Sequence, residues 1–405
     1  MDVAEQEVMA REPATLATDP FSESVLLDPY PFFDELRAAG PVAYLAAWDI
    51  YAVGNHAEAE IVASDYERFH SRAGMAMADI RRPDAWRTPS PISEVDPPEH
   101  TAIRRAMNRI LSPAVLRGWK QAFAEEAEAL VARVVSRDEF DGVRDLVEPF
   151  VASVFPSVLG VKIPAEAFLL VGQMNFNQMG PNNERTKASV AAAEPWFEQY
   201  EAAFQREGAI PGGFAEKIFE AEDAGDLPAG IAAPLVRSFI RGGVDTTIAG
   251  LGFTFNQLAQ NPDQYAIVHR DPSRSMAAFE EAIRHEAPAQ VVFRTVKEDI
   301  VLNGVRLKGD RKIGYFMGAA NRDAAKFEDP DRYRIERMSA GAHLALGRGV
   351  HVCVGQQIAR LEADCLVGAF ARRVAGFEPA GAPLYRPTNA LRTLESLPLR
   401  ITVRP

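Results

Sequence analysis

Along most of the chain, apolar residues recur at intervals of three and four, which is the periodicity of an amphipathic helix. Phe32, Phe33 and Leu36 follow it near the N-terminus and predict a first helix. Residues 100–135 follow it over a longer stretch, with a break near Ser112–Pro113. The pattern therefore predicts two successive helices there, in a chain that is mainly α-helical.

Short segments of alternating apolar residues predict small sheets beside these helices. The stretches at 41–45 and 50–53 are typical of a hairpin. Ile300–Leu302, Asn303–Gly304 and Val305 make a second strand-turn-strand signal, because Asn-Gly favours a tight turn between two strands. We therefore expect small peripheral β-sheets around the helical part.

Between Pro234 and Gln260 the helical pattern persists through residues that disfavour a helix. Gly242 and Gly243 lie in the middle of this stretch. An interior glycine costs about 1 kcal/mol relative to alanine. The pattern predicts one long helix whose centre gives up local stability for function, or, alternatively, a loosely packed helix crossing.

Composition and charge narrow the class of protein. The chain has 405 residues, 47% of them hydrophobic, and it shows no repeat or Gly/Ser-rich linker, so we expect residues 1–405 to form a single domain. Residues 1–18 are expected to be a poorly ordered tail. The formal net charge of -12 argues against nucleic acid or an anionic membrane as a partner. No apolar run predicts a membrane span or a signal peptide, which favours a cytoplasmic location. The two cysteines, Cys353 and Cys365, predict no structural disulfide.

The segment His343–Gly355, which reads HLALGRGVHVCVG, carries the most specific chemistry in the sequence. Its closely spaced glycines let the backbone turn tightly and point N–H groups at a sulfur. Cys353 stands just before a predicted helix start, where the positive end of the helix dipole lowers the pKa of a thiol. A cysteine thiolate pushes electron density onto haem iron. The alternative is an incidental glycine-rich turn before a helix.

This segment resembles the cysteine-ligand loop of the cytochromes P450, which reads Phe-Gly-x-Gly-x-His-x-Cys-x-Gly. One position departs from it: Leu346 stands where the family has a phenylalanine that shields the thiolate side of the haem. The resemblance implies the cytochrome P450 fold, a helical domain that encloses haem b. It also implies that Cys353 is the axial thiolate ligand of the iron.

Further motifs follow in the order that the family has them. Glu281 and Arg284 match the family's Glu-x-x-Arg, whose two residues share one helix face, and Arg337 resembles the third member of that buried network. A surface salt bridge is the ordinary interpretation of such a pair alone. Haem propionates in an apolar pocket need cationic donors. The residues that resemble these donors are His100, Arg104, Arg294 and His351.

The stretch from Gly242 to Thr246 resembles the family's oxygen-activation motif, Ala-Gly-x-Asp/Glu-Thr. Small residues leave room for dioxygen beside the haem. The Thr246 hydroxyl can bend the helix through the carbonyl four residues earlier, and Asp245 can relay protons. The resemblance therefore implies Asp245 and Thr246 as catalytic residues, with Gly242 in place of the usual alanine as a mild departure.

Three other segments, at 86–90, 176–181 and 236–239, resemble the bacterial P450 subgroup that oxidises para-substituted benzoic acids. In that subgroup an arginine and two serines bind the substrate carboxylate, which turns the far end of the ring toward the iron. The residues implied in substrate binding are Arg87, Ser90, Phe176, Met179, Ser238, Arg241 and Phe293.

Two of these residues depart from the subgroup. Arg241 stands where a serine is usual, and Met179 stands where a second phenylalanine is usual. Three interpretations of Arg241 are open. It could bind the substrate carboxylate directly, it could occupy part of the pocket so that a different acid is the substrate, or it could point away and pair with an acidic residue. The methionine makes the pocket wall more adaptable.

The resemblance implies a monooxygenase that hydroxylates or O-demethylates a small aromatic acid such as 4-methoxybenzoate with dioxygen. A separate ferredoxin and its NAD(P)H-dependent reductase are the implied partners, with Arg105, Arg109 and Arg348 as candidate docking residues. A monomer is expected. The alternatives are a P450 for another small hydrophobic substrate, a peroxide-using or isomerising haem-thiolate enzyme, which should lack the acid-threonine pair, and a non-enzymatic haem sensor.

Overall fold

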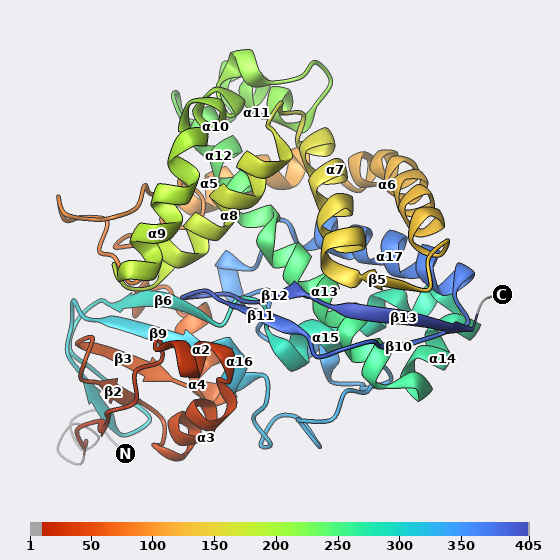
Figure 1. Ribbon diagram of the computed structural model, residues 1–405. Coiled ribbons are helices and arrows are strands. Elements are labelled where there is room, and N and C mark those ends of the chain that lie inside the picture. The colour runs from red at the N-terminus through yellow and green to blue at the C-terminus, as the bar shows by residue number, and fades with distance from the viewer. Residues whose placement is uncertain (1–9, 404–405) are drawn as a thin grey trace.

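The computed structural model describes residues 10–403. Helices make up most of this part of the chain and surround α13, which runs through its centre (Figure 1). The largest sheet lies on the side of the N-terminal strands, and the smaller sheets lie at the edges of the helical part (Figure 1). The expectation of a mainly α-helical fold with peripheral sheets is confirmed.

The helices are α2 (Glu23–Leu27), α3 (Tyr30–Ala38), α4 (His56–Ser64), α5 (Glu99–Ile110), α6 (Pro113–Val134), α7 (Glu148–Leu159), α8 (Ala165–Met179), α9 (Glu184–Ala193), α10 (Phe197–Ala203), α11 (Phe214–Asp223), α12 (Ala232–Gly243), α13 (Asp245–Gln260), α14 (Pro262–Arg270), α15 (Ser275–Glu286), α16 (Met317–Ala320) and α17 (Gln356–Arg373). The strands are β1 (Ala14–Leu16), β2 (Ala43–Leu45), β3 (Ile50–Val53), β4 (Phe69–His70), β5 (Glu139–Asp141), β6 (Val291–Val296), β7 (Ile300–Leu302), β8 (Val305–Leu307), β9 (Lys312–Phe316), β10 (Gly376–Pro379), β11 (Leu384–Pro387), β12 (Arg392–Ser396) and β13 (Pro398–Val403).

Both predicted hairpins are confirmed. β2 pairs antiparallel with β3, and β7 pairs antiparallel with β8 across the Asn303–Gly304 turn. The larger sheet has the strand order β1-β2-β3-β9-β6-β4. The expected disordered tail is wrong for residues 14–16, because β1 pairs in parallel with β2 and so belongs to this sheet. Residues 1–9 of that expectation lie outside the described residues.

The helix predictions are confirmed near the N-terminus. α3 buries Phe32, Phe33 and Leu36. The stretch 100–135 forms α5 and α6, and Ser112 between them has extended backbone with φ -66° and ψ 156°. Pro113 then starts α6, a position where the missing N–H of proline costs nothing.

The single long helix expected over 234–260 is wrong, since α12 ends at Gly243 and α13 begins at Asp245. Val244 between them has φ -87° and ψ -78°, which interrupts the helical hydrogen bonds. A Cβ atom added to Gly243 would lie 2.0 Å from Cζ of Phe155 on α7. Gly243 is therefore needed for close packing, whereas Gly242 is exposed and has nothing within 4 Å of an added Cβ.

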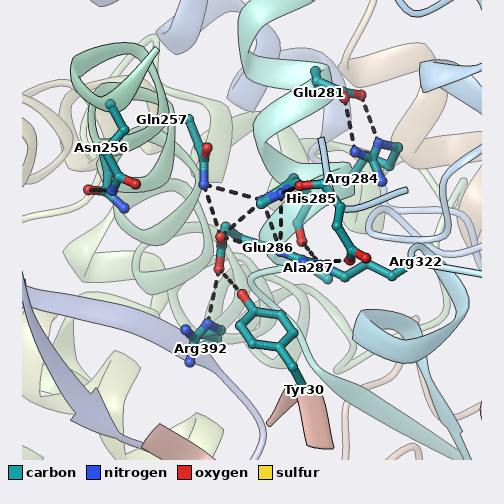
Figure 2. Close-up of polar contacts among 12 residues, drawn as sticks. Tyr30, Asn256, Gln257, Glu281, Arg284, His285, Glu286, Ala287, Arg322 and Arg392 are labelled. Carbon is teal, nitrogen blue, oxygen red and sulfur yellow. Dashed lines mark hydrogen bonds and ion pairs between the residues drawn. The ribbon is translucent and has the colours of Figure 1, made fainter. Parts of the chain in front are cut away.

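A buried ion network holds α15 to the segment that precedes the cysteine loop. The Glu281 carboxylate accepts hydrogen bonds from Nε of Arg284 at 2.7 Å and from Nε of Arg337 at 2.9 Å. Glu281 and Arg284 are fully buried, and Figure 2 shows this pair on one face of α15. The predicted network is confirmed, and its burial excludes the surface salt bridge.

A second polar network joins α3, α13, α15 and β12, as Figure 2 shows. The buried Glu286 carboxylate accepts hydrogen bonds from the Tyr30 hydroxyl at 2.8 Å, from Nε2 of Gln257 at 3.0 Å and from Nε of Arg392 at 3.0 Å. These residues come from α3, α13, α15 and β12. The network therefore fixes the C-terminal end of α13, where Gln257 lies, between α3 and β12.

Candidate active site

Cys353 lies at the end of a tight loop. Gly347 and Gly349 have φ of +72° and +69°, a left-handed conformation that glycine adopts without strain. The Cys353 N–H donates to the carbonyl of Leu346 at 2.8 Å, which closes the loop, and α17 starts three residues later. The predicted position of this cysteine just before a helix start is confirmed.

The surroundings of the Cys353 thiol act on its pKa in opposite directions. Burial raises the pKa of Cys353, while the backbone N–H groups of Gly355 and Gln356 and the positive charge of Arg104 lower it. Nη1 of Arg104 donates to the carbonyl of Val352 at 2.6 Å, so this cation is held beside the loop. N–H donors and a cation near the sulfur are the surroundings that a thiolate ligand requires.

The residues predicted to bind propionates gather beside this loop. The rings of His100 and His351 lie 4.3 Å apart between centroids. Neither ring nitrogen of His100 nor Nδ1 of His351 has a hydrogen-bond partner among the described residues, and Nε2 of His351 lies 3.7 Å from Oδ1 of Asp96. Burial, together with the nearby charges of His351, Arg104 and Arg294, lowers the pKa of His100 to about 4. An unpaired buried polar group costs about 1–3 kcal/mol, so this cluster fits a ligand with anionic acceptors such as the haem propionates.

Asp245 and Thr246 form the start of α13. The Thr246 hydroxyl donates to the carbonyl of Gly242 at 2.8 Å, as the sequence predicted. Asp245 is buried against α8, since a Cβ atom added to Gly172 would lie 2.9 Å from the Asp245 carboxyl carbon. Burial raises the pKa of Asp245 to about 7, which Arg386 partly opposes. A carboxyl group with this pKa can take up and release protons near neutral pH.

Glu362 on α17 is a buried acid that the sequence interpretation did not single out. It is 0% exposed, and neither carboxylate oxygen has a hydrogen-bond partner among the described residues. Burial raises the pKa of Glu362 to about 8, and the side chain of Thr247 on α13 partly opposes this shift. The group therefore holds a proton at neutral pH beside the helix that carries Asp245 and Thr246.

The residues predicted to bind the substrate carboxylate come together where the loop at 87–90 crosses α12. The Ser90 and Ser238 hydroxyl oxygens lie 3.0 Å apart. Ser238 donates to the carbonyl of Pro234 at 2.8 Å, so Ser90 is the donor within the pair. Arg87 forms a buried ion pair with Glu94, a partner that the sequence interpretation missed because the two residues lie seven apart in an irregular loop.

Arg241 pairs with no acidic residue within 10–403. Its Nε donates to the Tyr200 hydroxyl at 2.9 Å, and its Nη1 donates to the carbonyl of Thr88 at 3.1 Å. Arg237, on the same side of α12, donates from Nη2 to the carbonyl of Pro89 at 2.8 Å. The loop at 87–90 is therefore held onto α12 by two arginines and by the serine pair.

The apolar residues predicted to contact substrate are all buried. Phe176 and Met179 lie at the end of α8, in the same apolar cluster as Phe293. The Phe293 ring packs on Gly314 of β9, where an added Cβ would lie 3.0 Å from the ring. Because neighbouring residues of a strand point to opposite faces, Phe293 and Arg294 face opposite sides of the sheet.

Comparisons with known proteins agree with this geometry. The profile described as cytochrome P450 matches residues 198–374. The chain is 40% identical over 389 residues to cytochrome P450 CYP199A2 of Rhodopseudomonas palustris, which covers 96% of this chain and 94% of that protein. It is 29% identical to cytochrome P450 107B1 of Saccharopolyspora erythraea over 84% of each chain. The solved structure of cytochrome P450 CYP109Q5 from Chondromyces apiculatus has a TM-score of 0.80 at 27% identity, and the match covers 96% of this chain and 99% of that one. Among residues 10–403, no helix is both long and apolar enough to cross a bilayer.

Proposed function

The chain belongs to the cytochrome P450 family of haem-thiolate monooxygenases, and we propose that its substrate is a small aromatic carboxylic acid such as 4-methoxybenzoate. The observation that carries this proposal is a buried donor on Arg87. Its Nε has no hydrogen-bond partner among the described residues, although the side chain is only 4% exposed. Beside it, the Ser90 hydroxyl can turn from Ser238 toward an acceptor. Such a set of donors suits a carboxylate.

The haem fits the residues beside the cysteine loop. Cys353 would be the axial ligand, and His100, Arg104, Arg294 and His351 would donate to the propionates. When bound, the haem supplies the iron that binds and activates dioxygen. Leu346 in place of the family's phenylalanine gives the thiolate side an aliphatic cover, so its effect is expected in the reduction potential rather than in haem binding.

Asp245 and Thr246 would deliver protons to the oxygen side of the haem. Asp245 has a pKa near neutrality because it is buried, and Arg386 and Glu148, which pair at 3.8 Å, lie within electrostatic reach of it. Thr246 is held by its bond to Gly242, and its hydroxyl oxygen keeps a lone pair for water. Protons would pass from the Asp245 carboxyl group to a water molecule bound at the Thr246 hydroxyl, next to the exposed Gly242.

Binding through the carboxylate would orient the substrate. Arg87, Ser90 and Ser238 would hold the anionic end, while Phe176, Met179 and Phe293 would contribute to the apolar wall around the ring. A para substituent then points away from the donors, toward the iron. The predicted products are a 4-hydroxylated or O-demethylated benzoic acid.

Electrons would come from a ferredoxin and its NAD(P)H-dependent reductase, with Arg105, Arg109 and Arg348 at the docking surface. Arg105 is exposed, whereas Arg348 pairs with Glu60 at 2.9 Å and Arg109 pairs with Asp226 at 3.1 Å. Charge reversal at Arg105 is therefore expected to slow electron transfer most, because no acid of the same chain compensates it in residues 10–403.

The experiment uses spectra of the purified haem-loaded protein. Its reduced carbon-monoxide complex should show the thiolate-type Soret band, and Cys353→Ala should abolish it. Titration of the ferric protein with 4-methoxybenzoate should shift it from low to high spin, whereas the isosteric neutral 4-methoxybenzamide should bind at least about tenfold more weakly, because it lacks the charge-assisted hydrogen bonds. Equal affinity for the acid and the amide would overturn the carboxylate assignment.

A further inference from the structure

Three arginines surround the proposed carboxylate site, and one buried acid accompanies them. Arg87, Arg237 and Arg241, here called the arginine cluster, converge on the loop at 87–90, where Arg237 and Arg241 bind the carbonyls of Pro89 and Thr88. Glu94 pairs with Arg87. Within residues 10–403, no carboxylate lies within ion-pair distance of Arg237 or Arg241, whose contacts are carbonyl and hydroxyl oxygens.

The arginine cluster carries unbalanced positive charge. Burial lowers the pKa of Arg87, Glu94 raises it, and the charge of Arg241 lowers it again. Burial also lowers the pKa of Arg237, with Arg241 as the next cause. The three guanidinium groups therefore lie close enough to repel one another. Glu94 opposes the charge of Arg87, and the exposed Glu201 lies within electrostatic reach of Arg237. Arg241 has no ion-paired acid in residues 10–403, so its positive charge is the one left over.

Two buried donors point to a ligand at this place. Nε of Arg87 and Nε of Arg237 are both inaccessible to solvent and have no hydrogen-bond partner in the described part of the chain. Both side chains are otherwise held, Arg87 by Glu94 and Arg237 by the carbonyl of Pro89. Since buried N–H groups of native proteins are nearly always paired, an anionic ligand with several acceptor oxygens would complete them.

We infer that the arginine cluster selects an aromatic substrate whose head carries two negative charges, and that Arg241 sets this preference. The inference rests on the proposed function, in which the head of an aromatic acid binds at Arg87. A monocarboxylate would pair with the free donor of Arg87, whereas a dianionic head, such as two adjacent carboxylates or a phosphate monoester, would offer a second negative charge to Arg241.

Arg241 is the residue that distinguishes the two cases. It lies three residues after Ser238, so the two side chains share one face of α12. The Tyr200 hydroxyl and the Thr88 carbonyl hold its guanidinium in place without cancelling its charge. Where the resembling subgroup has a serine, this chain therefore adds one fixed cation to the site.

The test compares ligands of different charge and similar shape on the haem-loaded protein. The ferric protein is titrated with 4-methoxybenzoate, with 4-methoxyphthalate, which adds a second carboxylate, and with 4-methoxy-2-methylbenzoate, which adds bulk at the same position without charge. The dissociation constant for 4-methoxy-phenyl phosphate, measured in parallel, distinguishes a dicarboxylate from a phosphate. Arg241→Ser and Arg241→Lys are the two variants, and the reduced carbon-monoxide spectrum confirms that each is folded.

The wild type should bind at least one dianion about tenfold or more tightly than 4-methoxybenzoate, because one added charge-assisted hydrogen bond contributes roughly that much. Arg241→Ser should abolish this preference, so that the ratio of the two dissociation constants, dianion to 4-methoxybenzoate, rises to about one or more. The ratio is the readout, because the substitution also removes the bond to the Thr88 carbonyl and can weaken every ligand. Arg241→Lys, which keeps the charge, should retain most of the preference.

Two outcomes would refute the preference for a dianion without refuting the aromatic-acid proposal. In the first, 4-methoxybenzoate binds the wild type more tightly than both dianions. In the second, Arg241→Ser weakens the binding of all ligands equally, as expected if Arg241 only holds the loop at 87–90 in place. A third outcome would refute both proposals. If neither 4-methoxybenzoate nor a dianion shifts the spin state, the protein does not bind aromatic acids, and the preference for a dianion is refuted as well.

Discussion

Replacing Glu362 with glutamine is expected to stabilise the haem-loaded protein by an amount that grows with pH. The carboxyl group is fully buried, and burial raises its pKa from 4.5 to about 8 against the opposing effect of the Thr247 side chain. The folded protein therefore keeps a proton that the unfolded chain releases. Stability contributed by this group is complete below about pH 4.5 and is lost as the pH rises toward 8.

The magnitude follows from the two pKa values of Glu362. Each pH unit between them costs the wild type about 1.4 kcal/mol, so at pH 7, about 2.5 units above the unfolded value, the cost is about 3 kcal/mol. Glutamine has nearly the same shape and does not titrate. The advantage of the variant should thus be small near pH 5, increase through pH 7 and level off above about pH 8.

The assay is urea unfolding of wild type and variant, followed by circular dichroism at about half-unit steps from pH 5.5 to 8.5. Glu220→Gln on α11 is the matched control, since that carboxylate is exposed and solvated in the folded and unfolded chain alike. Its difference from wild type should not depend on pH. A pH-independent difference for Glu362→Gln as well would refute the assignment of a neutral, buried carboxyl group.

Three further substitutions test the remaining parts of the site. Glu281→Ala should lower the unfolding free energy by about 3–5 kcal/mol, because it leaves Arg284 buried without its counter-charge; a thermal midpoint equal to wild type would contradict the network. Asp245→Asn should lower the turnover rate about 10²–10⁴-fold and leave the spin-state titration unchanged. The rate of the variant should also lose its dependence on pH near 7. An unchanged rate with saturating ferredoxin would exclude a proton relay through this residue. Thr246→Ala should lower the product formed per NAD(P)H and raise hydrogen peroxide, whereas Thr254→Ala, which removes the same type of bond to a carbonyl four residues earlier, should not; equal losses in both would point to helix geometry alone.

Local spacing was enough to predict the elements that hold the chemistry. The cysteine loop has glycines at two left-handed positions, Gly347 and Gly349, and a helix begins just after Cys353. These features lie within ten residues of one another, so the sequence of one short segment predicts them. The same is true of Glu281 and Arg284, which share a helix face, and of the bond from Thr246 to the carbonyl four residues before it. Periodicity also predicted α3, α5, α6 and both hairpins.

The boundaries that the sequence did not predict depend on packing partners far along the chain. The central helix breaks at Val244 where Phe155 of α7 comes close to Gly243, and nothing in residues 234–260 marks that approach. β1 is ordered because β2 offers it a free edge, although residues 14–16 themselves read as a tail. Hydropathy patterns describe one segment at a time, so they carry no information on such contacts.

By itself, then, the sequence determined the ligand loop, the acid-threonine pair and the family, because short-range geometry fixes which groups stand side by side. Only the tertiary structure decided which acids are buried and which charges are paired. It buried Glu362 and Asp245 deeply enough to raise their pKa values to about 8 and about 7, and it paired Arg87 with Glu94. It also left Arg237 and Arg241 without an ion-paired acid in the described part of the chain. Burial and charge balance are sums over every neighbouring segment, and such sums exist only once the chain has folded.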